Sequence, residues 1–446
     1  MILGNLRAGV RSFRDVNAFC LRVLRPQSVP LVLVSTCGFA GGLVYLGVDI
    51  RSGAWIAVAV GAFGALDTIF SLAQRFSSPR KRVCPDERTS ALLSKLTVRD
   101  DHAADGYGVT FVPGFTDEAV VRSSAIDARL REPGTDFPLE VNEELRGQLD
   151  TKLQSHAQPF EDVIRLHYRR SRRSDPPKHF FNDAKVCLGG DLLRHTDTVE
   201  IYQGSYFHSF VTNELVTRSL WDEGVARPQP LYRGSEQFPA IVQRDGTVTL
   251  KRLPDAHMGN HIGISTVVHT SDKQLLLWRQ APAAQQNEGQ LVPTGSGSSD
   301  WGDWLAQPAG ASLKGLVTYA MAREFREESL NKLQPRAGAE APTIETRVLG
   351  HFLWMRRGGK PEFVGLSRIT WPSARSHPDA AEVEQPANLE PYPANTVSVM
   401  QRSIERILTG SGPYTAAVPL WVALTCLQEA LTADPEGWAA FLEIDV

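Results

Sequence analysis

The chain of 446 residues is long enough for two or three domains of ordinary size. Its net charge of −3 provides no bulk positive field, so composition gives no case for a nucleic-acid-binding protein. Its 5 cysteines show no CxxC pairing, which argues against a zinc site or a disulfide framework and fits a reducing compartment.

The first stretch of the chain, residues 1–28, is basic. Its apolar residues recur at roughly helical spacing, and its charged residues are one acid, Asp15, and the arginines Arg7, Arg11, Arg14, Arg22 and Arg25. This pattern is typical of a basic amphipathic helix, which can lie at a membrane surface.

Two apolar runs follow. Residues 29–48 carry no charge, and residues 54–70 carry only Asp67. A run of about 20 apolar residues spans a bilayer as a helix, so the runs predict a transmembrane hairpin. Basic residues flank its outer ends, which predicts a two-helix multi-pass membrane protein with both termini cytoplasmic. The Gly38–Gly42 spacing hints at a homo-oligomer through the hairpin. A buried helical hairpin in a soluble protein is the alternative.

The composition divides the chain into four parts. These are the basic segment with the hairpin (1–76), a basic linker (77–90), a mixed α/β region of unknown role (91–255) and a C-terminal domain (256–446). The third part contains a basic run at 165–178. Such a run is either a solvated loop or a contact for the phosphates of a ligand or of lipid.

The C-terminal domain alternates between strand-like and helix-like patterns. Four segments have the composition of strands: 261–270, 274–279, 345–353 and 362–369. Gly295, Ser296, Gly297 and Ser298 form a Gly/Ser-rich loop, and such loops let the backbone approach phosphate oxygens. Helices are predicted over 313–330, with Ser312 as the N-cap, and over 397–408 and 416–431.

The helix predicted over 313–330 carries a ladder of carboxylates. Glu324, Glu327 and Glu328 are spaced i, i+3 and i+4, so they share one helical face. Like charges stacked in this way repel by a few tenths of a kcal/mol per pair. Water and salt offset that repulsion on an open surface, and inside a cleft a hard cation such as Mg²⁺ does so better.

The segment Arg-Glu-Phe-Arg-Glu-Glu, beginning at Arg323, resembles the metal-binding half of the Nudix box. The flanking half departs from it, since Gly315 stands where the box has Glu, and Leu330 stands where it has Gly. The resemblance implies an α+β chain that ends in a Nudix-like α/β/α sandwich. In this fold class a mixed α/β region and an N-terminal transmembrane helical hairpin precede the sandwich. The mixed region has aromatic- and Asn-rich stretches that resemble those ahead of diverged Nudix-like domains in bacterial proteins.

The resemblance also implies roles for individual residues. Glu324, Glu327 and Glu328, helped by Glu362 on a late strand, would hold Mg²⁺ or Mn²⁺. The backbone of Gly295–Ser298 would bind phosphate.

Arg323 would be structural. In the family this arginine pairs with the Glu that is Gly315 here, so Asp300 or Asp303 is expected to replace that partner.

Two functions follow from these patterns. One is a membrane-anchored, divalent-metal-dependent hydrolase of a nucleoside diphosphate derivative. The alternative is a catalytically inactive Nudix-like module that senses a nucleotide-type small molecule and is coupled to the membrane hairpin. In both, the partners are a nucleotide and the lipid bilayer, and no nucleic acid is expected.

Overall fold

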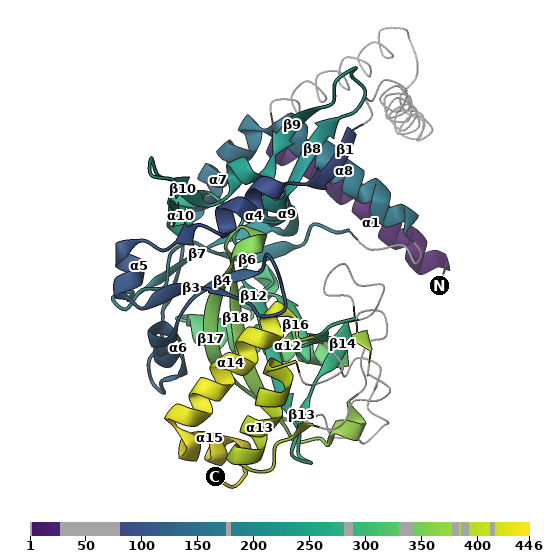
Figure 1. Cartoon of the computed structure of the whole chain (residues 1–446). Helices are drawn as coiled ribbons and strands as arrows, with labels where there is room; N and C mark the ends of the chain where they lie inside the picture. The colour runs from purple at the N-terminus through teal and green to yellow at the C-terminus, as the bar shows by residue number, and fades with distance from the viewer. Residues whose placement is uncertain are drawn as a thin grey trace.

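The largest sheet in the computed structural model joins two strands from residues 107–123 to strands from residues 263–393 (Figure 1). The structure describes residues 2–26, 81–174, 180–280, 289–329, 342–376, 383–384, 392–410 and 415–446. The strand order is β20-β13-β12-β18-β17-β4-β3, and β16 also pairs with β12. The bounds are β3 (Tyr107–Phe111), β4 (Ala119–Ser123), β12 (Gly263–His269), β13 (Gln274–Leu276), β16 (Gly295–Ser298), β17 (Ile344–Trp354), β18 (Lys360–Ile369) and β20 (Tyr392–Pro393).

Helices cover both faces of this sheet. Strand β12 is buried along its whole length, and it runs parallel to β18 and antiparallel to β16. Helix α12 (Leu313–Ser329) packs on one face, where Val317 and Met321 meet Phe363. The C-terminal helices pack on the other: α13 (Val397–Leu408), α14 (Val418–Ala433) and α15 (Pro435–Leu442). The result is a three-layer α/β/α arrangement.

Four smaller sheets surround the large one. Their strands are β1 (Lys81–Pro85), β8 (Arg218–Asp222) and β9 (Gln229–Arg233); β2 (Leu96–Thr97), β10 (Ala240–Val242) and β11 (Val248–Leu250); β5 (Leu139–Val141), β6 (Ala184–Leu188) and β7 (Val199–Ser205); β14 (Trp278–Gln280), β15 (Leu291–Val292) and β19 (Val383–Glu384). The other α-helices are α1 (Ile2–Phe19), α4 (Glu87–Leu93), α5 (Asp100–Ala104), α6 (Ser124–Arg131), α7 (Glu143–Ser155), α8 (Ala157–Arg173), α9 (Tyr206–Thr212), α10 (Leu253–Ala256) and α11 (Trp301–Leu305).

The amphipathic N-terminal helix packs on protein. The apolar stripe of α1 and of the π-helical turn after it (Cys20–Leu24) enters the core formed by α7, α8 and α9. There the ring of Phe19 lies edge-on to that of Phe207, with centroids 5.5 Å apart. At the other end of the interface, Arg25 pairs with Glu161 at 2.9 Å. The apolar stripe of α1 is therefore covered by protein, and not by the membrane surface that the sequence pattern suggested.

The transmembrane part of the predicted fold class is wrong. Among the described residues, no helix is both long enough and apolar enough to cross a bilayer. Helix α1 has 18 residues, but its interior holds three arginines and Asp15. The two apolar runs, 29–48 and 54–70, lie outside the described residues. The structure has the predicted mixed α/β character. It does not support the two-helix membrane architecture or the membrane localisation that was derived from it.

The region before residue 256 contributes to the large sheet. Strand β4 pairs with β17, where Phe352 faces Arg122. The boundary at 255/256 therefore does not separate two sheets. Within the predicted linker, residues 81–85 form β1, which pairs with β8.

Replacing Phe19 by Ala tests the packing of α1. Phe19 is 3% exposed, so its loss should lower the free energy of unfolding by roughly 3–4 kcal/mol, measured by urea denaturation of the full chain. Phe13→Ala on the same helix is the control, because Phe13 is 44% exposed and its loss should have a much smaller effect. Equal effects of the two substitutions would show that α1 does not pack as described.

Candidate functional site

Helix α12 carries the three predicted carboxylates. It begins where the Oγ of Ser312 accepts a hydrogen bond from the backbone N–H of Gly315 (3.1 Å), which satisfies an amide of the first turn. Five side chains form its buried apolar stripe: Leu316, Val317, Ala320, Met321 and Phe325. This packing turns Glu324 and Glu328 toward the neighbouring strand β16.

Residues Gly295–Ser298, predicted to form a loop, form strand β16 and pair antiparallel with β12. The glycines permit the close approach of α12. A Cβ on Gly295 would lie 2.8 Å from the backbone of Phe325, and one on Gly297 would lie 2.2 Å from Oε1 of Glu324. The loop prediction is therefore wrong, because these glycines are needed for helix packing.

Strand β16 also holds the carboxylate of Glu328 in place. The backbone N–H of Ser296 donates to Oε2 of Glu328 at 3.1 Å, and Glu328 is only 5% exposed. One of the four amides expected to bind phosphate is thus engaged within the protein. The phosphate-binding role of β16 stays a prediction.

Arg323 connects the elements of the site. Its Nε and Nη2 donate to the two carboxylate oxygens of Asp303 at 2.8 and 3.1 Å. Its Nη2 also donates to the backbone carbonyl of Ser298 (3.0 Å) and lies 3.1 Å from Oε1 of Glu324. Its Nη1 donates to Glu327 at 3.1 Å. One guanidinium therefore contacts three carboxylates, as expected for an arginine with a structural role in this position.

Asp303 is the acidic partner of Arg323, in place of the glutamate that is Gly315 in this chain. It is one of the two replacements expected from the sequence. It lies on the short helix α11 and is 3% exposed. Burial alone would lower the pKa of Arg323, but the hydrogen bond to Asp303 and the charge of Glu324 raise it above its ordinary value. Arg323 therefore stays charged in the site.

A second cation reaches the site from the mixed α/β region. Lys185, on β6, forms an ion pair with Asp300, which lies 3.8 Å from the Nη2 of Arg323. No local sequence pattern predicts this contact, because the two residues lie 115 positions apart in the chain.

The pKa of Glu324 is altered by its surroundings. Its side chain is 14% exposed, and burial raises its pKa from 4.5 to about 7. The charges of Arg323 and Lys185 act in the opposite direction, and Glu327 adds to the rise. Desolvation thus outweighs the ion pair with Arg323.

Glu362 lies apart from the α12 carboxylates. It is on β18 opposite Gly263 of β12, and Gly263 in turn faces Ser298 of β16. Two strand spacings, about 10 Å, therefore separate its backbone from that of β16. Glu362 pairs with the buried Lys360, whose pKa burial lowers to about 8 although Glu362 acts to raise it.

These donors do not fit a divalent cation as they are arranged. No three His, Cys, Asp or Glu side chains among the described residues form a group that could hold one. Arg323 pairs with Glu324 and Glu327, a backbone amide binds Glu328, and Lys360 pairs with Glu362. Each carboxylate of the predicted Mg²⁺ or Mn²⁺ site thus already has a cation or an amide of the protein as its partner.

Comparisons with known proteins add little to this geometry. No family model and no curated protein matches the chain. The similar solved structures include DR0079 from Deinococcus radiodurans, which is 14% identical over 37% of this chain and 82% of that one. They also include the MutT protein from Methanosarcina mazei Go1, which is 14% identical over 40% of this chain and 95% of that one. Both have a TM-score of 0.23, so neither likeness carries an argument.

Gly295→Ala tests why β16 is glycine-rich. The new Cβ meets the backbone of Phe325, which has no flexible end to move, so the free energy of unfolding should fall by about 1–3 kcal/mol. Gly302→Ala is the matched control, since no atom lies within 4 Å of its Cβ and alanine favours the α11 helix. Thermal unfolding of both variants gives the comparison, and an unchanged Gly295→Ala protein would contradict the packing explanation.

The raised pKa of Glu324 predicts a pH-dependent stability. Between pH 4.5 and about 7 the native state keeps a proton that the unfolded state has lost, so stability falls as the pH rises through this window. Glu324→Gln removes this effect. Its stability relative to wild type should therefore grow by roughly 2–3 kcal/mol from pH 5 to pH 8.

Urea denaturation at several pH values measures this difference. Glu405→Gln, at an exposed position of α13, is the control and should follow the wild-type profile. Parallel profiles for wild type and Glu324→Gln would contradict the raised pKa.

Proposed function

We propose that the C-terminal domain is a Nudix-like module that binds a nucleotide-type ligand without hydrolysing it. The observation that carries this proposal is the set of contacts made by Arg323. This single cation pairs with Asp303, Glu324 and Glu327, so two carboxylates of the ladder already have a partner within the protein. A hydrolase of this kind needs those carboxylates for a metal.

Two further features support the proposal. Glu362 pairs with Lys360, and strand β12 lies between its own strand β18 and β16. Lys185 brings a second cation to the site from outside the C-terminal domain. A phosphate-bearing ligand would bind these two cations in competition with their present carboxylate partners. The nucleotide class comes from the resemblance of the Arg323–Glu328 segment to the Nudix box.

One observation favours the alternative, a divalent-metal-dependent hydrolase. The pKa of Glu324 is raised to about 7 by burial, and strongly altered carboxyl groups gather at catalytic sites. The ion pairs of Arg323 would have to rearrange before this carboxylate became available. The test that distinguishes the two functions is therefore whether the protein converts its ligand to product.

Turnover and binding should be measured on the same panel of dinucleotides and nucleotide sugars. With the full chain, we expect ligand-induced thermal stabilisation in EDTA to match that in Mg²⁺ or Mn²⁺, with dissociation constants differing by less than about threefold. Chromatography of the same mixtures should detect no product.

Glu328→Gln is the informative variant, with Glu405→Gln as the control at a distant exposed helix position. Metal-dependent turnover that Glu328→Gln abolishes and Glu405→Gln retains would establish the hydrolase. A protein that neither binds nor converts any member of the panel would contradict both functions.

A further inference from the structure

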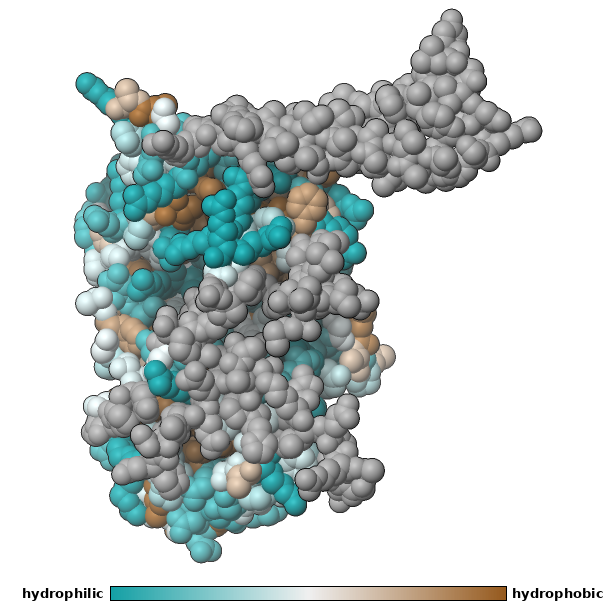
Figure 2. All heavy atoms as spheres, turned by 90° about the vertical axis from the view of Figure 1, so that its right-hand side faces the viewer, coloured by the Kyte–Doolittle hydropathy of each residue, from teal (hydrophilic) through white to brown (hydrophobic). Residues whose placement is uncertain are grey.

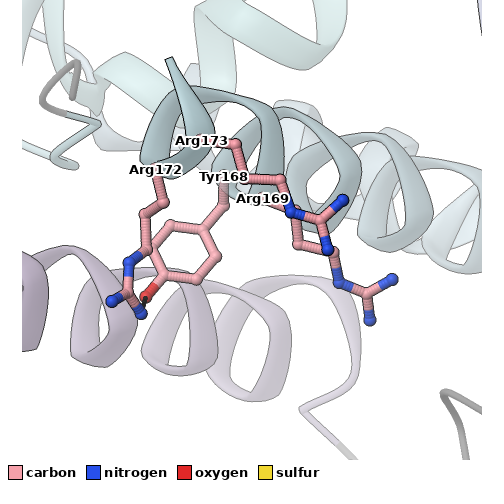
Figure 3. A pocket seen from close by; sticks show the side chains of 4 residues that line it. All are labelled: Tyr168, Arg169, Arg172 and Arg173. Carbon is pink, nitrogen blue, oxygen red and sulfur yellow. Dashed lines mark hydrogen bonds between the residues drawn. The ribbon is translucent and has the colours of Figure 1, made fainter. Parts of the chain in front are cut away.

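The arginines on the surface of this protein keep their charge in mild acid. Figure 2 shows hydrophilic side chains over much of the visible part of one face. Figure 3 shows the end of α8, where Arg172 donates to the hydroxyl of Tyr168 at 3.4 Å, and Arg169 and Arg173 lie on the other side of the ring. All four residues belong to one helix, so they form a surface. Arginine does not lose its proton in proteins, whereas histidine ordinarily changes its charge between pH 5 and 8.

Three histidines in or next to the large sheet are buried. His261 lies two residues before β12, His269 is the last residue of β12, and His351 lies in β17. Their exposures are 3%, 1% and 2%. Strands β12 and β17 flank β18 at the centre of the sheet, so a proton on any of the three places a charge in the core.

The rings of these histidines have unsatisfied nitrogen atoms. The Nδ1 atoms of His261, His269 and His351 are buried and have no hydrogen-bond partner among the described residues. The Nε2 of His351 also has none, whereas the Nε2–H of His269 donates to the carbonyl of Ala394 at 3.1 Å. Protonation places an N–H on Nδ1, and no acceptor in the described structure is within reach of it. A buried donor without an acceptor destabilises a fold.

The charges around His261 are positive. Burial is the main cause that lowers its pKa, and Lys360, Arg357 and Lys185 add to the effect. The nearest ring, that of Tyr206, lies 6.4 Å away and offers no negative charge. The carboxylates that pair with these three cations are Glu362, Glu214 and Asp300. A proton on His261 would add a fourth positive charge where β6 meets β12.

His269 has one acid in its surroundings. Burial lowers its pKa to about 4, although the hydrogen bond to Ala394 acts to raise it. Lys273 and Arg368 oppose protonation, and the charge of Asp272 favours it. Asp272 already accepts hydrogen bonds from the backbone N–H and the hydroxyl of Ser373. Burial and the two cations therefore keep the imidazole neutral.

His351 is surrounded by core. Its ring lies 4.8 Å from that of Phe363, and burial lowers its pKa to about 3. The nearby acid is Asp127 of α6, which accepts a hydrogen bond from the backbone N–H of His351 at 2.8 Å. The other oxygen of this carboxylate is bound by Arg122 at 2.6 Å. The ring itself therefore has no counterion.

Two other buried histidines have the acid partners that these three lack. His102 lies 3.5 Å from Asp101 and 3.6 Å from Asp191. The Nε2 of His208 lies 2.9 Å from Asp150. A carboxylate this close stabilises an imidazolium ring. Within the described ranges, no such pair involves the histidines of the large sheet.

We propose that these three histidines make the large sheet a pH-sensitive switch, packed at neutral pH and opened in mild acid. An unfolded histidine takes up its proton near pH 6.5, whereas in the fold each of the three stays neutral to a much lower pH. The stability that the neutral rings contribute is therefore complete above pH 6.5 and is lost as the pH falls towards 4. Because β16 and α12 rest on β12, opening also dismantles the site around Arg323. The switch does not depend on whether that site binds a nucleotide.

One carboxylate of that site acts in the opposite direction. Glu324, with its raised pKa, keeps a proton in the fold between pH 4.5 and about 7, and this offsets about one histidine. Buried Glu118 and Asp127, whose pKa values burial also raises, act in the same sense as Glu324. A comparison of wild type with histidine variants cancels these shared contributions.

Urea denaturation of the full chain at pH 7.5 and pH 5.0 tests the switch, with the variants His261→Gln, His269→Gln and His351→Phe. Each neutral buried histidine makes the unfolding equilibrium constant rise by about thirtyfold between these pH values. In each variant the rise should therefore be about thirtyfold smaller than in wild type. His195→Gln, at an exposed position, is the control and should match the wild-type rise within about twofold. The same pH dependence in wild type and all three variants would overturn the proposal.

Hydrogen exchange of the wild-type chain locates the opening without any variant. After correction for the intrinsic exchange rates, the amides of β12, β17 and β18 should lose protection at least about a hundredfold between pH 7.5 and pH 5.0. That factor allows for the opposing effect of Glu324. Unchanged protection in these strands, or a loss confined to the sheet of β1, β8 and β9, would contradict a switch in the large sheet.

Discussion

The interaction on which the C-terminal site depends is the set of ion pairs around Arg323. Its guanidinium joins α12 to α11 through Asp303 and to the end of β16 through the carbonyl of Ser298. Removing this side chain would leave Asp303, only 3% exposed, without its cation, and an unpaired buried carboxylate is costly. The same guanidinium pairs with Glu324 and Glu327, so the cation that joins these elements also reduces the repulsion within the carboxylate ladder.

Local patterns predicted much of the fold. The helix over 313–330 is observed as Leu313–Ser329, and that over 397–408 as Val397–Leu408, because their apolar periodicity coincides with the face that is buried. Asp303 could be predicted from the sequence. Glycine at position 315 removes the usual glutamate partner of Arg323, so another acid is expected to take its place. Lys185 was not, because its contact with Asp300 depends on how two distant segments meet.

The N-terminal prediction failed for a different physical reason. An amphipathic stripe indicates that one side of a helix is buried away from water. It does not indicate whether lipid or protein covers that side. In α1, Val16 and Phe19 are covered by protein, and the polar side forms specific pairs such as Arg165 to Asn17 at 3.1 Å. The prediction of a loop over residues 295–298 failed similarly, because a glycine-rich stretch can serve a close helix contact as readily as a loop.

Helices α8 and α12 both carry like-charged side chains close together, arginines on α8 and glutamates on α12. On α12 the repulsion among Glu324, Glu327 and Glu328 is offset from within, by Arg323 and by the amide of Ser296. On α8 the acids that might serve the arginines are already bound to cations elsewhere. A like-charged ladder whose repulsion is offset from within needs no external ligand to be stable, which is the situation of the α12 carboxylates.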